Sequence, residues 1–261
     1  MRLAAEHFGA GRELVMVHGW GMHSSVWRDF AAELAGSRRV TLIDLPGHGD
    51  SPFVGQRALS AWADACLEVA PVSAVWLGWS LGSLVALQAA LQAPQRVAGI
   101  LVLAGMPRFV QGEEWPHAMA SRTLDLFIQS LGKEHTRTLE RFLALQMLGG
   151  DQAQENLRRL KRRLRERPEP HPEALERGLD LLKQADLRCR LGELECPTAW
   201  LYGDRDTLAP AAAAALLVRW LPKFSSAVIR GAAHAPFLSH PIETRRTVDR
   251  FLEAFDADRR R

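Results

Sequence analysis

The chain has 261 residues, of which 47% are hydrophobic and 24% charged, as in an ordinary globular protein. Its formal net charge of +3 at pH 7 is too small to indicate binding to nucleic acid. No window approaches the roughly 18 uninterrupted apolar residues of a membrane-spanning helix, and the N-terminal segment reaches charge and glycine too early for a signal peptide. Cys66, Cys189 and Cys196 lack metal-ligand spacing, fit a reducing compartment and are expected to be packing residues. We expect a cytoplasmic monomer that binds neither nucleic acid nor a membrane.

Short aliphatic runs alternate with helical stretches along most of the chain. Each run is apolar on both faces, as a parallel strand must be when helices cover both sides of its sheet. The alternation predicts right-handed crossovers and a doubly wound, mostly parallel α/β sheet. The expected strands are residues 14–18, 40–44, 74–79, 99–105, 198–202 and 226–231, and the expected helices lie near residues 27–35, 60–69, 81–93, 210–220 and 241–255.

The alternation stops between residues 108 and 185, where the sequence is charged, leucine-spaced and helical. This segment follows one expected strand and precedes another, so it should lie above the carboxyl ends of the strands, where open α/β sheets bind ligands. We call residues 108–185 the lid segment, and expect the core to consist of residues 1–107 and 186–261.

A basic run in the lid segment, residues 158–167, carries seven basic side chains and one acidic side chain. A solvated helix face and a docking site for an acidic partner are both consistent with it. The helical period places one set of its residues on an apolar seam and another on an outward stripe. The seam consists of Leu157, Leu160 and Leu164, and the stripe of Arg158, Arg162 and Arg165.

The sequence GWSLG, residues 78–82, lies between an expected strand and an expected helix. In that context G-x-S-x-G predicts a sharp turn, in which side chains next to the serine would collide, so Gly78 and Gly82 relieve the crowding. Ser80 is then exposed on a strained turn at a helix N-terminus, which favours a nucleophile over a helix cap.

A serine nucleophile needs a general base and a group that orients the base. His234 lies in a small-residue loop after the last expected strand, whereas His240 precedes Pro241 and suits a capping or surface role. Asp206 follows the preceding strand and is our choice for the acid, with Asp204 as the alternative. We expect Asp204 to form a turn by bonding to its own backbone two residues further on. The order Ser, Asp, His is that of the α/β-hydrolase architecture.

An oxyanion hole requires two donors, one of them the amide after the nucleophile. We assign the backbone N–H groups of Trp20, in the loop HGWG, and Leu81. Ser51 lies in a glycine-rich loop without G-x-S-x-G and is expected to be structural. Because the chain lacks a G-x-G-x-x-G opening, a Walker lysine and a metal-ligand cluster, we expect no cofactor and no metal.

These motifs together resemble the α/β-hydrolase superfamily over nearly the whole chain. Four segments are similar, more narrowly, to the carboxylesterases that act on pimeloyl-acyl-carrier-protein methyl ester in biotin synthesis. They are WLGWSLG (76–82), EEWP (113–116), RTLERFLALQ (137–146) and AAHAPFLSHP (232–241). The chain departs from that pattern at Ser83, where the family often has glycine, and in its denser basic run.

The resemblance implies a serine esterase whose substrate is carried by acyl carrier protein. It implies that Trp20 and Leu81 contact the substrate, and that an acyl channel is lined by Phe142, Leu143, Ala144, Leu145 and Gln146. It also implies that Arg137, Arg141 and Arg158 meet the phosphopantetheine phosphate and the acidic helix of the carrier. Alternatives are a generalist short-chain esterase or lactonase, a carbon–carbon bond hydrolase and a non-catalytic receptor that keeps the triad. A dehalogenase is disfavoured because it would have aspartate where this chain has Ser80.

Overall fold

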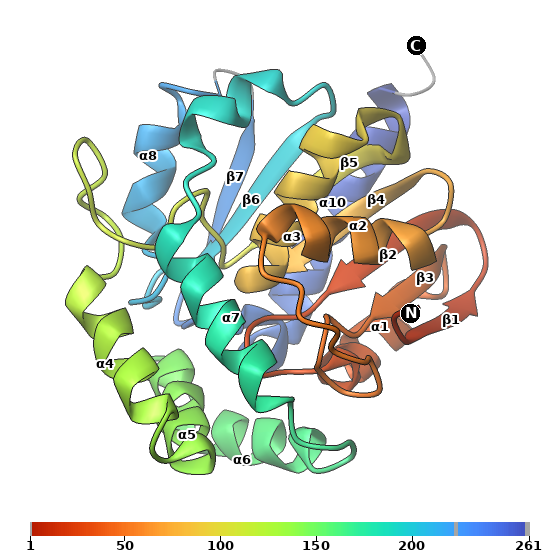
Figure 1. The fold of residues 1–261 in the computed structure, drawn as a ribbon. Helices are drawn as coiled ribbons and strands as arrows, with labels where there is room; N and C mark the ends of the chain where they lie inside the picture. Colours follow the sequence, from red (N-terminus) through yellow and green to blue (C-terminus); the bar gives the residue numbers. More distant parts are fainter. Residues whose placement is uncertain (1, 222–223, 259–261) are drawn as a thin grey trace.

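A seven-stranded sheet forms the centre of the computed structural model, which describes residues 2–221 and 224–258 (Figure 1). The strand order is β1-β3-β2-β4-β5-β6-β7, and every neighbouring pair is parallel except β1 with β3. The predicted α/β class and its mostly parallel sheet are confirmed. The strands are β1 (Ala5–Gly9), β2 (Arg12–Val17), β3 (Arg38–Ile43), β4 (Ala74–Trp79), β5 (Val97–Leu103), β6 (Thr198–Gly203) and β7 (Ser225–Ile229).

Strand β1, which was not predicted from the sequence, pairs with β3 at the edge of the sheet. Its residues are half-buried or exposed, and its sequence AEHFG contains a charged residue and a histidine. An edge strand that is not buried by helices on both of its faces does not need a continuous apolar run. The criterion that found the six central strands therefore does not apply to this one.

Helices cover both faces of the sheet, and successive side chains of the strands divide between them. In β2, Val15 and Val17 join one apolar cluster, while Leu14 and Met16 join the other. Trp62 and Leu84 pack in the first cluster, and Phe30 and Leu252 in the second. The covering helices are α2 (Leu59–Val69) and α3 (Leu81–Gln92) on the first face, and α1 (Arg28–Leu34) and α10 (Pro241–Asp258) on the second.

Other predicted elements differ in detail. The helix expected near 210–220 is shorter, since a 3₁₀ turn at Ala211–Ala213 precedes α8 (Ala214–Leu217), and α9 (Pro236–Ser239) was not expected. Cys66 is buried, but Cys189 is exposed, so the expectation that it packs in the interior is wrong. None of the helices within the described residues is long and apolar enough to span a bilayer.

The lid segment contributes four helices between β5 and β6, and they lie together at one end of the sheet (Figure 1). Two isolated bridges, Val110 with Met119 and Gly112 with Trp115, precede the first helix. The helices are α4 (Ser121–Leu131), α5 (His135–Met147), α6 (Ala153–Leu164) and α7 (Pro172–Gln184). The division of the chain at residues 108 and 185 stays a prediction.

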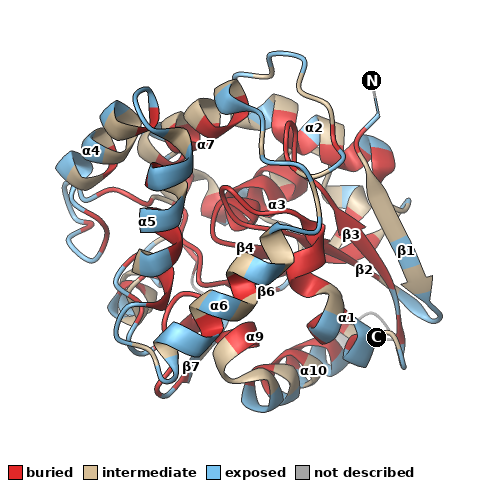
Figure 2. Ribbon diagram, turned by 90° about the horizontal axis from the view of Figure 1, so that it is seen from below, coloured by how far each residue is buried: buried red, intermediate tan, exposed pale blue. Residues whose placement is uncertain are grey.

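Helix α6 has the two faces that its sequence predicts. Leu160 is fully buried, and Leu157 and Leu164 pack against the same apolar cluster. The stripe of Arg158, Arg162 and Arg165 is exposed. Figure 2 shows the same division on α5 and α6, with exposed residues along the outer side. Three of the seven basic side chains of this run are thus exposed.

Candidate active site

The turn between β4 and α3 holds Ser80 in a backbone conformation that residues other than glycine rarely adopt, with φ 54° and ψ −120°. Such backbone strain costs about 1–3 kcal/mol and persists only where the surrounding structure enforces it. A Cβ on Gly78 would lie 2.3 Å from the carbonyl oxygen of Gly82, and one on Gly82 would lie 2.4 Å from that of Val17. The crowding predicted from the sequence is therefore present, and only glycine fits at both positions.

Ser80, His234 and Asp206 form one hydrogen-bonded chain. His234 Nε2 lies 2.9 Å from Ser80 Oγ, and His234 Nδ1 lies 2.8 Å from Asp206 Oδ2. The carboxylate can only accept, so Nδ1 carries the proton and Nε2 is free to accept one from the serine. All three residues are buried, and Ser80 is only 3% exposed, so the expectation that it lies exposed on the turn is wrong. The arrangement suits nucleophilic attack by the serine under general-base catalysis.

Asp206 is held by its own loop, because its Oδ1 accepts the N–H groups of Leu208 at 2.8 Å and Ala209 at 3.0 Å. This leaves Oδ2 to orient His234. Asp204 behaves differently from our expectation: its Oδ1 accepts the N–H of Gly231 at 2.7 Å. The prediction that Asp204 bonds to its own turn is wrong. It is Asp206 that does so, while Asp204 ties the acid loop to the histidine loop.

Two further contacts fix the histidine loop. The N–H of His234 donates to the carbonyl of Gln146 in α5 at 3.1 Å, and the indole of Trp79 donates to the carbonyl of His234 at 2.7 Å. The sequence analysis treated Trp79 as a mark of the family and gave it no role. No local pattern reveals the bond, since its partners are separated by 155 residues.

The segment after β2, residues 18–25, passes close to the serine, and we call it the oxyanion loop. A Cβ on Gly19 would lie 3.2 Å from Ser80 Cβ. Leu81 begins α3, so its N–H has no acceptor within the helix. Within residues 2–221 and 224–258, no backbone hydrogen bond uses the N–H of Trp20 or of Leu81. Both predicted oxyanion donors are thus available.

The oxyanion loop is tied to the loop after β3 by two buried histidines to which the sequence analysis gave no role. His18 Nε2 accepts the N–H of Leu45 at 2.9 Å, and His18 Nδ1 donates to the carbonyl of Gly19 at 2.8 Å. His48 Nε2 accepts the N–H of Gly21 at 3.4 Å. Burial lowers the pKa of each histidine to about 3, which keeps both acceptor nitrogens free at neutral pH.

The lid segment covers the site with apolar side chains. The Trp20 ring lies edge-on to Phe142, with ring centres 4.7 Å apart, and its indole donates to the carbonyl of Leu175 in α7 at 2.8 Å. Of the residues expected to line a channel, Phe142, Leu143 and Gln146 are buried, Leu145 is partly buried and Ala144 is exposed. Five consecutive residues of an α-helix cannot all face one side. Ala144 therefore does not line the inner side.

The remaining candidates lie outside this constellation. Ser51 Oγ donates to the carbonyl of Asp44 at 2.6 Å, a structural role as expected. His240 Nδ1 lies 2.9 Å from Ser239 Oγ, and its Nε2 lies 3.6 Å from Asp151. Among the described residues, no group of three or more His, Cys, Asp or Glu could hold a metal ion. The predicted carrier-docking residues Arg137, Arg141 and Arg158 are all exposed on α5 and α6.

Comparison with known proteins identifies the family of the chain. A family model described as alpha/beta hydrolase fold matches residues 13–241. The chain belongs to the α/β-hydrolase family. An esterase from Exiguobacterium antarcticum has a similar structure, with a TM-score of 0.88 over 96% of this chain and 95% of the other, at 19% identity. That likeness concerns the fold.

Curated relatives are more similar in sequence. A pimeloyl-[acyl-carrier protein] methyl ester esterase of Pectobacterium carotovorum is 45% identical over 248 residues, which cover 94% of this chain and 96% of the relative. The protein of the same name from Photobacterium profundum is 41% identical over 245 residues, 94% of this chain and 96% of its own length. This hydrolase chain is therefore similar to these esterases along nearly all of its length.

The two aspartates of the acid loop provide a matched test. In Asp206→Asn, the two amides that hold Oδ1 force the new NH₂ group toward His234, so the histidine takes the wrong tautomer. We expect kcat on a p-nitrophenyl ester to fall by about 10⁴-fold, as for the equivalent Asp→Asn substitution in a serine-protease triad. Asp204→Asn keeps the Oδ1 acceptor for Gly231 and should retain activity within about threefold, as for a substitution that preserves its hydrogen bond. The opposite pattern would move the role of the acid to Asp204.

His18 and His48 make the stability of the protein depend on pH. Their pKa values fall from 6.5 to about 3 on folding, so the unfolded chain binds more protons between these limits. The free energy of unfolding should therefore decrease as the pH falls below about 6.5, by up to about 1.4 kcal/mol per pH unit for each histidine. Urea titrations between about pH 7 and 5 measure this slope. His48→Gln should reduce it, and His117→Gln, an exposed control, should not. A stability independent of pH in this window would contradict the assignment.

Proposed function

We propose that the protein is a serine carboxylesterase of biotin biosynthesis, which hydrolyses the methyl ester of pimeloyl-acyl carrier protein to pimeloyl-acyl carrier protein and methanol. The observation that carries the hydrolytic part is the chain of hydrogen bonds from Ser80 through His234 to Asp206. The names of relatives that are 41–45% identical support the substrate. We further propose that it acts as a cytoplasmic monomer.

The geometry suits a two-step acyl transfer. Ser80 Oγ attacks the ester carbonyl carbon while His234 Nε2 takes the hydroxyl proton, and Asp206 stabilises the imidazolium. The negative charge on the carbonyl oxygen is met by the N–H groups of Trp20 and Leu81. The intermediate then collapses, and His234 returns the proton to the departing methoxide, which leaves as methanol. Water then attacks the acyl-enzyme as His234 takes one of its protons. His234 returns this proton to the leaving Ser80 Oγ, and the acid product loses its own proton to solvent.

The inner side of the lid segment supports an acyl chain as the substrate. Phe142 and Leu143 are buried, and Phe142 packs on Trp20 beside the oxyanion loop. Gln146 Nε2 is buried and has no hydrogen-bond partner within the described part of the chain. An unpaired buried donor is costly unless a ligand satisfies it. We propose that this amide donates to a carbonyl of the substrate, and that the apolar side chains contact its methylene chain.

A hollow between α5 and α6 supports a route for the arm of the carrier. It measures about 330 Å³ and reaches Gly21, in the oxyanion loop. Leu139, Leu143 and Leu164 form part of its wall, and Lys161 and Arg165 also line it. A phosphopantetheine arm has an apolar portion, which these leucines can contact. It also carries negative charge, which basic side chains along its route attract. We propose that the arm passes through this hollow.

The outer surface of the lid segment supports an acidic protein partner. Within the part of the chain that the structure describes, Arg137 and Arg158 each form one ion pair, and both pairs are exposed. Arg137 pairs with Glu134, the N-cap of α5, at 3.3 Å, and Arg158 pairs with Glu155 of α6 at 3.7 Å. Exposed pairs of this kind contribute little, so another carboxylate can compete for the arginine. Arg141 is exposed one turn from Arg137. We propose that these three arginines bind the acidic helix and the phosphate of the carrier.

The direct test is to incubate the protein with methyl-pimeloyl acyl carrier protein and to measure the mass of the carrier. The proposal predicts the loss of one methylene mass as the ester becomes an acid, and no change with Ser80→Ala. Turnover of p-nitrophenyl esters without this change would favour a generalist esterase. Ligand binding without any turnover would indicate a receptor.

The docking proposal predicts a difference between substrates. Arg137→Glu combined with Arg141→Glu should lower kcat/KM on the carrier-bound ester by about tenfold or more, because reversed rim charges slow the association of charged partners. The value on a small free ester should stay within about twofold, since the catalytic groups are unchanged.

The control for this prediction is Arg246→Glu combined with Arg250→Glu, which reverses two exposed arginines at the same spacing on α10. This control variant changes the net charge by the same amount, but at a site on α10 instead of on the lid helices. Equal losses on both substrates for the lid variant, or equal losses for both variants, would contradict docking through α5.

A further inference from the structure

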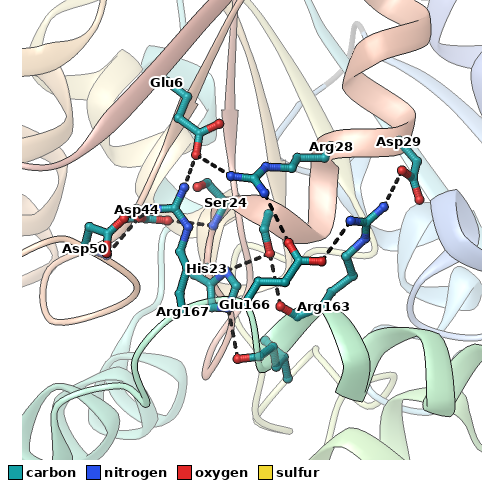
Figure 3. Close-up of polar contacts among 12 residues, drawn as sticks. Glu6, His23, Ser24, Arg28, Asp29, Asp44, Asp50, Arg163, Glu166 and Arg167 are labelled. Carbon is teal, nitrogen blue, oxygen red and sulfur yellow. Dashed lines mark hydrogen bonds and ion pairs between the residues drawn. The ribbon is translucent and has the colours of Figure 1, made fainter.

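A guanidinium from the lid segment reaches the core beneath the oxyanion loop. Arg167 follows α6, its side chain is only 10% exposed, and it forms ion pairs with Glu6, Asp44 and Asp50 (Figure 3). The distance from Arg167 to Asp44 Oδ2 is 3.1 Å. The three acidic residues belong to β1 and to the segment after β3. One lid side chain thus links the lid segment to two separate parts of the core.

Asp44 connects this ion pair to the oxyanion loop. Its Oδ1 accepts the N–H of Ser24 at 2.6 Å, and its Oδ2 accepts the N–H of Asp50 at 3.1 Å. The residue is 1% exposed. A carboxylate buried this deeply is destabilised unless a cation and hydrogen-bond donors compensate it. Arg167 is the cation that the structure sets against it, so the Ser24 contact depends on charge supplied by the lid segment.

Residues on both sides of Ser24 also contact the end of α6. His23 Nε2 lies 3.3 Å from the carbonyl oxygen of Leu164, and Ser25 Oγ donates to that of Arg163 at 3.3 Å. Three consecutive residues of the oxyanion loop are therefore connected, directly or through Asp44, to the lid segment. Trp20, whose amide is our proposed oxyanion donor, lies four residues earlier in the same loop. The position of the Trp20 N–H is thus linked to the packing of α6 against the core.

We propose that Arg167 is a positioning residue for ester hydrolysis, which holds the oxyanion loop through Asp44 only when the lid segment is seated on the core. Displacing the lid segment withdraws the guanidinium, loosens the Ser24 contact and weakens the oxyanion site. The enzyme then hydrolyses efficiently only with its lid closed over the substrate. This inference rests on the proposed function, because it assigns Trp20 to the oxyanion hole.

A neighbouring set of ion pairs at the same junction provides the control, and it joins the first set where Arg28 pairs with Glu6 at 3.0 Å. Arg163 pairs with Asp29 and with Glu166, which in turn pairs with Arg28 (Figure 3). These contacts also fasten α6 to the core, but the Arg163 guanidinium does not contact Asp44. Arg163→Gln keeps the backbone carbonyl that Ser25 uses. A variant at this position therefore separates general fastening of the lid segment from positioning of the loop.

The experiment compares Arg167→Gln, Arg167→Lys and Arg163→Gln on a small p-nitrophenyl ester, which needs no carrier docking. We expect kcat of Arg167→Gln to fall by about tenfold or more with KM within about twofold, because full loss of an oxyanion donor costs about 10²–10³-fold. Arg167→Lys keeps the positive charge and should recover part of the loss. Arg163→Gln should stay within about twofold of wild type, since its lost ion pairs are partly exposed.

Hydrogen exchange gives a readout that does not depend on turnover. Amides of residues 20–26 should exchange faster in Arg167→Gln than in wild type and Arg163→Gln, because the loop opens more often. Unchanged kcat and exchange in Arg167→Gln, equal losses in Arg163→Gln, or a rise in KM alone would each overturn the inference. If Arg167→Gln does not fold, Arg167→Lys decides the test. A partial loss of kcat with faster exchange in Arg167→Lys would support the inference, and wild-type values of both would overturn it. A wild type that does not hydrolyse the ester would contradict the proposed function. In that case the hydrogen exchange of residues 20–26 still tests whether Arg167 holds the oxyanion loop.

Discussion

The close approach of two backbone turns at the carboxyl ends of β2 and β4 is the constraint on which the rest of the site depends. Gly82 lies against the carbonyl of Val17, and Gly19 lies against Ser80. Neighbouring parallel strands bring these turns together, and α3 begins at Leu81 with its N–H groups aimed at the same point. Any side chain at Gly78 or Gly82 would push the nucleophile away from the oxyanion loop. One packing contact thus fixes Ser80 relative to the proposed oxyanion donors.

Around this contact, distant segments supply the remaining parts through buried polar bonds. The histidine loop is held by Trp79 and by the backbone of Gln146, and the oxyanion loop by His18, His48 and Asp44. These bonds hold both loops in place without substrate, as a preorganised site requires. The lid segment contributes to both loops, through Gln146 to one and through Arg167 to the other. The role that we propose for the lid segment is therefore to complete the site as well as to cover it.

The sequence predicts those parts of the structure that local patterns encode. Apolar runs locate six strands, and the tight G-x-S-x-G turn locates Ser80, because the strand, glycines and helix are contiguous. The seam and stripe of α6 follow from helical periodicity alone. Contacts between distant segments are different. The bond from Asp204 to Gly231 spans 27 residues and that from Arg167 to Asp44 spans 123, so neither leaves a local pattern. The basic run could be recognised, but not the fact that its last arginine points inward.

The most direct measurement of the central claim, that Ser80 is activated by His234 and Asp206, is covalent labelling with a fluorophosphonate followed by peptide mass spectrometry. Such a reagent phosphonylates a serine whose proton can be removed by a neighbouring base: the serine oxygen bonds to phosphorus and fluoride leaves. The account predicts one adduct, on Ser80, that forms rapidly in the wild type and is nearly absent in His234→Ala. An adduct on another serine, or labelling of Ser80 at the same rate without His234, would contradict it.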